Sequence, residues 1–252
     1  MATIRLDIRF RPELKNPVLV GGIPDSGFVA KLAMDHIIKE LNAQLFAEIY
    51  SYSFPAQVLI KPDGTVDLPR NELYFWKSSD SDRDLVLFTG DTQPNTPQGA
   101  YEICDRVLEV AQSLGVKRVY TVGAYIMGSF VDKPKVYGTA TEVQLLDELK
   151  NFGIQTMDSG SVTWMNGLLF GLTTLRGMQG VFLSSETSGY VVDPKAGQAV
   201  LEALGALLKI KIDMAALEKR AKETEALIKT MEAYRRTYEK PSDQPPPSEV
   251  YR

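Results

Sequence analysis

The sequence predicts a three-layer α/β/α sandwich with a mostly parallel, partly mixed sheet, followed by a C-terminal helix and an extended tail. Short apolar runs bounded by turn residues alternate along the chain with longer amphipathic helical patterns. This alternation is typical of βαβ units with helices on both faces of a sheet. A Pro-Asp-Gly turn at 62–64 lies between two short strand patterns and adds a hairpin, and therefore antiparallel pairing, at one side.

The first part of the chain begins with residues 4–10, which alternate strictly between apolar and polar side chains. Such alternation indicates a half-buried strand, which we expect at an edge of the sheet. Residues 22–27 then make the turn between a buried strand and a helix. The other elements predicted in this part are a strand at 17–21, a helix at 29–41, a strand at 45–50, the hairpin at 58–67, and strands at 72–76 and 85–88.

The second part opens with a helix for which Pro97 fits the first position and Gly115 the end. Thr141 and Gln144 have the spacing of a capping pair at the start of a later helix. Asp193 is expected to cap the helix that runs to about residue 208. The other elements predicted here are strands at 116–123, 154–157 and 180–184 and helices at 141–152 and 164–175.

We expect one α/β domain over residues 1–212, a helix over 213–240 and a flexible proline-rich tail over 241–252. The helix carries apolar residues at a spacing of three and four, with charges between them. This stripe consists of Met214, Leu217, Ala221, Leu227, Ile228, Met231, Tyr234 and Tyr238. It requires burial, either against its own domain or against the same helix of another subunit, and the second alternative implies a homo-oligomer.

Composition excludes several classes of function. The 252 residues carry a net charge of −4 with pI ≈ 5.2, so there is no basic footprint for nucleic acid. No apolar run approaches the roughly 18 residues that span a bilayer, and residues 1–7 lack the apolar core of a signal peptide. Cys104 is the single cysteine, so no internal disulfide framework is expected. These features predict a cytoplasmic protein without nucleic-acid or membrane partners.

The tail has an unusual composition for a terminal segment. Prolines at 241 and 245–247 favour an extended, solvated backbone, which reaches about 25 Å between 241 and 248 at ~3.1 Å per residue. Val250, Tyr251 and Arg252 follow beside the free carboxylate, although loose termini usually end in small or polar residues. The tail is therefore either a ligand held out to a partner or a frayed end whose apolar residues are accidental.

Candidates for catalysis are few. His36 is the one histidine and lies near the apolar face of its predicted helix, which favours a packed or hydrogen-bonded residue over a general base. Without a second histidine, a histidine-based metal site is not expected. Cys104 follows the apolar position of Ile103 and is expected in the core. We therefore predict a non-catalytic protein with no catalytic residue, no metal and no cofactor.

An enzyme or a nucleotide-binding protein is the alternative. The turn at 22–27 joins a strand to a helix N-terminus, where α/β folds bind anions, but its glycines lack the dinucleotide spacing and a tight turn needs glycine in any case. Polar residues in loops after later strands would share this carboxyl edge of the sheet, where they are either ligand contacts or turn formers. They are Asp91, Asp132, Asp158, Ser159, Ser161, Asn166 and Glu186.

Several stretches together resemble the proteasome assembly chaperones of the second type, in particular their archaeal-type members. They are FPAQV at 54–58, LPRNELYFW at 68–76, TGDTQP at 89–94, GVKRVYTVGAY at 115–125, KPKVYGTAT at 133–141, GLLFGL at 167–172 and SETSGY at 185–190. The resemblance runs in unbroken order from about residue 17 to 212. It departs at 22–27, where such members more often have a longer glycine-rich turn.

The resemblance implies an α/β domain shaped like nucleoside phosphorylases, without established catalysis, that acts on the proteasome. Members with a tail ending in hydrophobic-tyrosine-any residue resemble activators and assembly factors that dock this tail on the α-ring. Here the motif falls on Val250, Tyr251 and Arg252. The implied partners are the α-subunits of the proteasome core particle, and the protein is expected to be a homo-oligomer or to work with a paralogous chain.

Overall fold

The computed structural model describes residues 4–79 and 82–238. Its strands are β1 (Ile4–Ile8), β2 (Val18–Gly21), β3 (Gln44–Ser51), β4 (Leu59–Ile60), β5 (Val66–Asp67), β6 (Asn71–Trp76), β7 (Leu85–Gly90), β8 (Arg118–Ile126), β9 (Val136–Ala140), β10 (Gln155–Thr156) and β11 (Gln179–Thr187). Its helices are α1 (Val29–Glu40), α2 (Pro97–Ser113), α3 (Val143–Asn151), α4 (Trp164–Gly171), α5 (Pro194–Leu208) and α6 (Ala215–Tyr238), with 3₁₀ turns η1 (Ser26–Phe28) and η2 (Leu172–Arg176). No helix among these described residues is long and apolar enough to span a bilayer.

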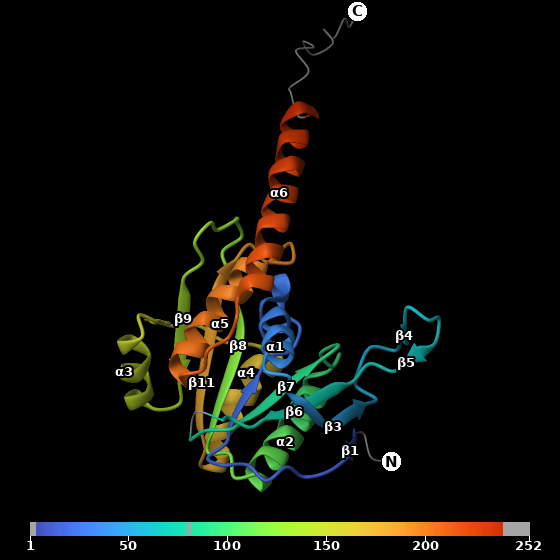
Figure 1. The fold of residues 1–252 in the computed structure, drawn as a ribbon, viewed down its shortest axis with the longest axis vertical. Coiled ribbons are helices and arrows are strands. Elements are labelled where there is room, and N and C mark those ends of the chain that lie inside the picture. Colours follow the sequence, from blue (N-terminus) through green and yellow to red (C-terminus); the bar gives the residue numbers. More distant parts are fainter. Residues whose placement is uncertain (1–3, 80–81, 239–252) are drawn as a thin grey trace, which may run out of the picture.

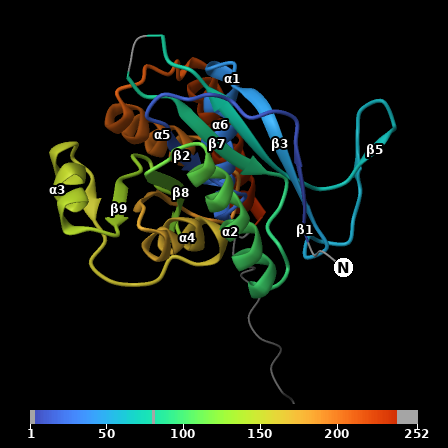
Figure 2. The ribbon, with the colours of Figure 1, turned by 90° about the horizontal axis from the view of Figure 1, so that it is seen from below.

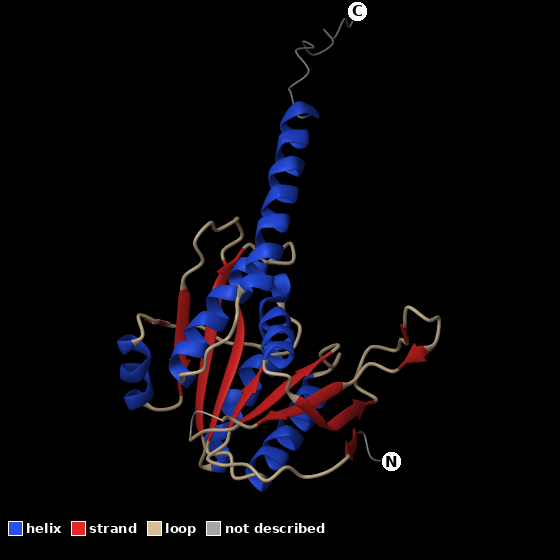
Figure 3. Ribbon diagram, in the orientation of Figure 1, coloured by secondary structure: helices blue, strands red, loops and turns tan. Residues whose placement is uncertain are grey.

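A nine-stranded sheet in the order β1-β3-β6-β7-β2-β8-β11-β9-β10 forms the middle layer. Its centre is parallel, because β2 runs parallel to β7 and β8, and β8 runs parallel to β11. Helices α1 and α5 cover one face, and α2 and α4 cover the other, as the view from below shows (Figure 2). The three-layer sandwich and its mixed sheet are therefore confirmed (Figure 3).

The antiparallel share of the sheet is larger than the sequence indicated. Strands β1, β3 and β6 continue the sheet antiparallel from β7, and β9 is antiparallel to β11 at the other side. The sequence analysis missed β9, since VYGTA carries a glycine and too few apolar residues for a strand pattern. The hairpin at 62–64 forms as expected, but β4 and β5 make a separate two-stranded ribbon that stands away from the main sheet (Figure 1).

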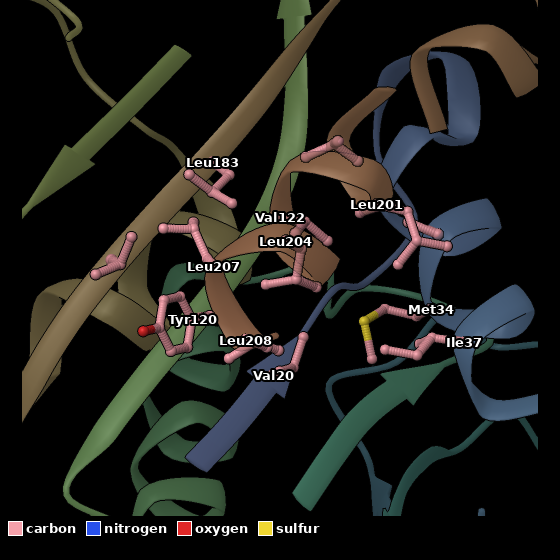
Figure 4. Close-up of a cluster of buried hydrophobic side chains, with 14 of the residues drawn as sticks. Val20, Met34, Ile37, Tyr120, Val122, Leu183, Leu201, Leu204, Leu207 and Leu208 are labelled. Atoms are coloured by element: carbon pink, nitrogen blue, oxygen red, sulfur yellow. The ribbon is translucent and has the colours of Figure 1, made fainter. Parts of the chain in front are cut away.

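Two buried clusters hold the layers together. The cluster under α1 and α5 joins β2, β8 and β11 to both helices, with Met34, Tyr120, Leu183 and Leu204 among its members (Figure 4). The cluster under α2 and α4 contains Leu19, Phe88, Ile103 and Cys104. Each face of the sheet thus buries its own apolar core, as this architecture requires.

Local capping signals set the starts of α2 and α5, but not that of α3. The side chain of Thr96 accepts a hydrogen bond from Gly99 N, and that of Asp193 accepts one from Ala196 N, so α2 and α5 have the expected starts. The predicted capping role of Thr141 is wrong. Its Oγ1 instead accepts a hydrogen bond from Gly180 N at 2.9 Å and ties β9 to β11, and Glu142 precedes α3 without a side-chain cap.

Candidate functional site

Val250, Tyr251 and Arg252, the residues predicted to contact a partner, lie outside the described part of the structure, as does the rest of the tail. The described element closest to them in sequence is α6, which starts against the body and then runs away from it (Figure 1).

The base of α6 packs in the same core as α1 and α5. Leu217 and Ala221 are 1% and 5% exposed, and Met214 packs against the same cluster. Beyond them Leu227 is 61% exposed. Ile228, Met231, Tyr234 and Tyr238, which the sequence analysis assigned to the same stripe, have side chains outside the described part. The base of the stripe, as far as Ala221, is thus packed within its own subunit, whereas Leu227 is not.

Polar contacts fix the angle at which α6 leaves the body. The side chain of Asp213 accepts a hydrogen bond from Ala215 N at 2.9 Å, and the carbonyl oxygen of Asp213 lies 2.6 Å from His36 Nε2. Because a carbonyl oxygen only accepts, Nε2 of His36 carries a proton in this contact. His36 is 7% exposed and joins α1 to the start of α6, which confirms the structural interpretation of the single histidine.

Replacing His36 with leucine should lower the free energy of unfolding by about 1–2 kcal/mol, because the Asp213 carbonyl loses its donor. Urea denaturation of both proteins measures this difference. Lys39→Leu is the matched control, since Lys39 lies exposed on the same helix. A His36→Leu protein as stable as the control would show that the hydrogen bond does not anchor α6.

A groove of about 210 Å³ lies where α6 passes the loop after β8 and the start of α5. Phe130, Val192 and Ala221 give it an apolar lining. At its rim Lys195 Nζ lies 2.9 Å from Asp132 Oδ1 and 3.1 Å from Glu225 Oε2. Both ion pairs are open to solvent and therefore weak, so the pair with Glu225 orients α6 more than it stabilises it.

Asp132 was among the polar residues predicted from the sequence, but the rest of this groove was not predicted. Its lining comes from three segments far apart in the chain, after β8, after β11 and in α6. Phe130 and Val192 are 51% and 44% exposed. The sequence could not predict this exposure, because both residues lie in loops without a regular spacing of apolar residues. Only the fold brings them together.

The glycines of the turn at 22–27 serve packing. A Cβ on Gly22 would come 2.8 Å from both Met34 Cγ and Val122 Cγ2, and one on Gly21 would come 2.8 Å from Leu169 Cδ2. Real Cβ atoms do not approach other atoms this closely, so only glycine fits between these side chains. Core side chains occupy the space next to Gly21 and Gly22.

Two amide side chains form hydrogen bonds with the backbone of the same turn. Asn166 accepts a hydrogen bond from Ile23 N at 2.9 Å and donates one to Ile23 O at 3.0 Å. Gln93 donates to Pro24 O and accepts from Met165 N. Asn166 Oδ1 therefore already occupies the N–H of Ile23, a donor that a phosphate at this turn could otherwise contact.

The other polar residues predicted at the carboxyl edge act separately. Glu186 is buried and accepts hydrogen bonds from Lys135 N and from the hydroxyl of Tyr137, at 3.0 and 2.9 Å. Asp91 accepts from Arg70 N, and Asp132 pairs with Lys195. Asp158, Ser159 and Ser161 are exposed in the loop before α4. Nowhere in residues 4–79 and 82–238 do three or more metal-ligating side chains gather.

Asp25 is the one carboxyl group here in an unusual environment, and the sequence analysis did not single it out. Its Oδ1 accepts a hydrogen bond from Ala30 N at 3.0 Å, while its buried Oδ2 has no hydrogen-bond partner among the described residues. Burial raises the pKa of Asp25 to about 7, against the opposing effect of backbone N–H groups led by that of Ala30. Cys104 is fully buried, and burial raises the pKa of its thiol, so it is an inert core residue.

Comparison with known proteins identifies the family. Residues 19–232 match the family described as PAC2. The chain belongs to the PAC2 family. The resemblance read from the sequence motifs is therefore confirmed, and the match extends into α6.

Solved PAC2 structures include two from Pyrococcus furiosus. PbaB, an archaeal proteasome activator, is 38% identical, with 92% of this chain and 100% of that chain covered and a TM-score of 0.87. PbaA, an archaeal homolog of proteasome-assembly chaperone, is 25% identical, with coverage of 90% and 96% and a TM-score of 0.73. An uncharacterized protein of Methanocaldococcus jannaschii is 35% identical over 237 residues, which are 94% of this chain and 91% of the relative.

Proposed function

We propose that this protein binds the α-subunits of the proteasome core particle and acts as a non-catalytic assembly chaperone or gate-opening activator. The observation that carries the proposal is the 38% identity, over 92% of the chain, to an archaeal proteasome activator. The direction of α6, which leads the end of the chain away from the body, supports it as well (Figure 1).

Val250, Tyr251 and Arg252 are the proposed contact residues. The carboxylate after Arg252 would pair with a basic side chain in a pocket of the α-ring, a recurring mode of C-terminal capture. Val250 would fill an apolar groove, and Tyr251 would stack its ring while its hydroxyl finds a polar partner. From Lys229 to Tyr238 the helix adds about 14 Å at 1.5 Å per residue, and the proline segment adds about 25 Å. The three residues would thus stand well clear of the body.

A homo-oligomer would present several tails at once. The described base of α6 is buried in its own subunit, so the part left to pair with another subunit starts near Leu227. Truncation after residue 229 is therefore the informative test of assembly, because it spares Leu217 and Ala221 in the core. Removal of everything from 213 onward would open that core.

Peptide hydrolysis by a purified core particle, measured with and without the protein, tests the proposed function. Stimulation that disappears with Tyr251→Ala indicates activation through the tail. Binding to free α-subunits without stimulation indicates assembly. A protein that neither stimulates hydrolysis nor binds α-subunits would contradict the proposal.

The turn at 22–27 argues against the nucleotide-binding alternative at the carboxyl edge. Asn166 and Gln93 already form hydrogen bonds with the backbone of this turn. A thermal-shift screen with nucleotides and nucleosides checks it directly. If a nucleotide raises the melting temperature of the wild type, and substitution of Asn166 removes this effect, that alternative is supported.

A further inference from the structure

A second, larger groove lies at the opposite end of the sheet from the point where α6 leaves the body. Residues at the amino ends of β2, β8 and β11 line it, together with the end of α3 and the end of α5. Its volume is about 680 Å³. Ligand sites in proteins commonly have volumes of about 300–1,000 Å³, so the groove can hold a small organic molecule.

The acidic side chains in this groove are already paired. Asp82 forms an ion pair with Lys15, and Glu148 Oε2 lies 3.0 Å from Arg118 Nη1. Glu148 offsets the charge of Arg118, whereas no carboxylate of the described residues pairs with Lys117 or Lys209 in the groove. The acidic net charge of the whole chain does not describe this surface.

Arg118 is held in a fixed orientation at the groove. Its Nε donates to Gln179 Oε1 at 2.8 Å, and its Nη1 donates to Glu148 and to the hydroxyl of Tyr120. The structure shows no hydrogen bond from its Nη2 to any described residue. A guanidinium group with one side fixed and one side open is suited to an anionic oxygen.

Lys117 and Lys209 add two ammonium groups. Both side chains are exposed in the groove lining, and neither forms an ion pair within residues 4–79 and 82–238. Lys209 has the left-handed backbone conformation, with φ of 58°, at the end of α5. Glycine or asparagine is the usual residue in that conformation, and here the lysine side chain enters the lining of the groove instead.

Phe152 supplies an apolar surface beside these cations. It caps the end of α3, lines the groove and is 42% exposed. Leu207 and Leu208 lie in the same lining and are almost fully buried, which closes the groove on the side of the core. An accessible aromatic ring near positive side chains is the combination that a planar base with attached phosphates requires.

We propose that this groove binds a nucleotide, with its phosphates held by Lys117, Lys209 and Arg118 and its base against Phe152. The site is independent of the tail and lies at the amino edge of the sheet, away from the carboxyl edge where nucleotides bind in most α/β folds. It would leave the tail free to engage a partner at the other end of the molecule.

Titration calorimetry with the full chain and ATP, tripolyphosphate or adenosine tests the site. ATP should bind saturably, and Lys117→Gln with Lys209→Gln should weaken ATP at least ~10-fold, because two charge-assisted contacts are lost. The matched control is Lys219→Gln with Lys222→Gln, two exposed lysines of α6, which should bind ATP like the wild type. Phe152→Ala should weaken ATP about fivefold or more without changing tripolyphosphate.

Absence of saturable ATP binding would overturn the proposal, as would equal binding by the wild type and the Lys117/Lys209 double variant. Adenosine that binds as well as ATP would rule out the phosphate contacts. If tripolyphosphate binds as tightly as ATP, and Phe152→Ala does not change the affinity for ATP, the base contact would be ruled out. None of these results depends on binding to the proteasome, so they leave the proposed function to its own test.

Discussion

Deletion of Val250, Tyr251 and Arg252 should abolish binding of this protein to isolated proteasome α-rings and leave its free energy of unfolding unchanged. Binding falls because the proposed carboxylate, apolar and aromatic contacts all lie in these three residues. Stability is retained because the described core clusters are complete without them. Surface plasmon resonance with immobilised α-rings measures the first quantity, and urea denaturation measures the second.

Deletion of Asp243, Gln244 and Pro245 is the matched control. It also removes three residues of the tail but keeps the terminal tripeptide, so binding should persist. If the protein that lacks 250–252 binds as the wild type does, the tail is not the contact.

The same experiment measures how far affinity depends on several tails. A free peptide with the sequence of 241–252 should bind α-rings ~10²–10⁴-fold more weakly than the whole protein, if several tails of one oligomer dock together. Equal affinity of peptide and protein would indicate that each tail acts alone. Truncation after residue 229 in a separate sedimentation experiment then shows whether the outer part of α6 holds the oligomer together.

Much of the fold could be predicted because short-range signals decide it. Pro97 with Thr96 at the start of α2, and Asp193 at the start of α5, act through contacts within one helical turn. The failure at Thr141 has the opposite cause. The spacing predicted that its hydroxyl would accept a hydrogen bond from a nearby backbone N–H of α3. The hydroxyl instead accepts one from Gly180 N, 39 positions away, because β9 lies beside β11. A contact between distant segments overrode the local signal.

The sites were predictable only in part for the same reason. The cations of the groove at the amino edge come from the start of β8 and the end of α5, and neither segment carries a phosphate-binding motif. Asp25 is buried where the turn before α1 meets β8, since its Oδ2 would lie 3.7 Å from a Cβ built on Gly123. A sequence shows which residues can bind or titrate, whereas the fold decides which of them meet.

The free energy of unfolding of the wild type should fall as the pH rises from about 4 to about 8. Replacement of Asp25 with asparagine should remove this contribution. Burial raises the pKa of Asp25 from the ordinary 3.8 to about 7 in the folded chain. Between these values the folded chain binds a proton that the unfolded chain has released, so the free energy of unfolding falls as the pH rises. The loss is complete above the folded pKa and amounts to at most about 4 kcal/mol, from 1.36 kcal/mol per pKa unit.

Urea denaturation of both proteins at intervals between pH 4 and pH 9 measures this contribution as the difference between the two curves. Asparagine keeps the acceptor for Ala30 N and removes the titrating group, so the difference isolates the ionisation. Asp147→Asn, a change of equal charge at a side chain that is 67% exposed, should leave the pH dependence of the wild type intact. Should Asp25→Asn follow the wild-type curve throughout, the carboxyl group is ionised at neutral pH, and the buried Oδ2 must have a partner that stabilises its charge.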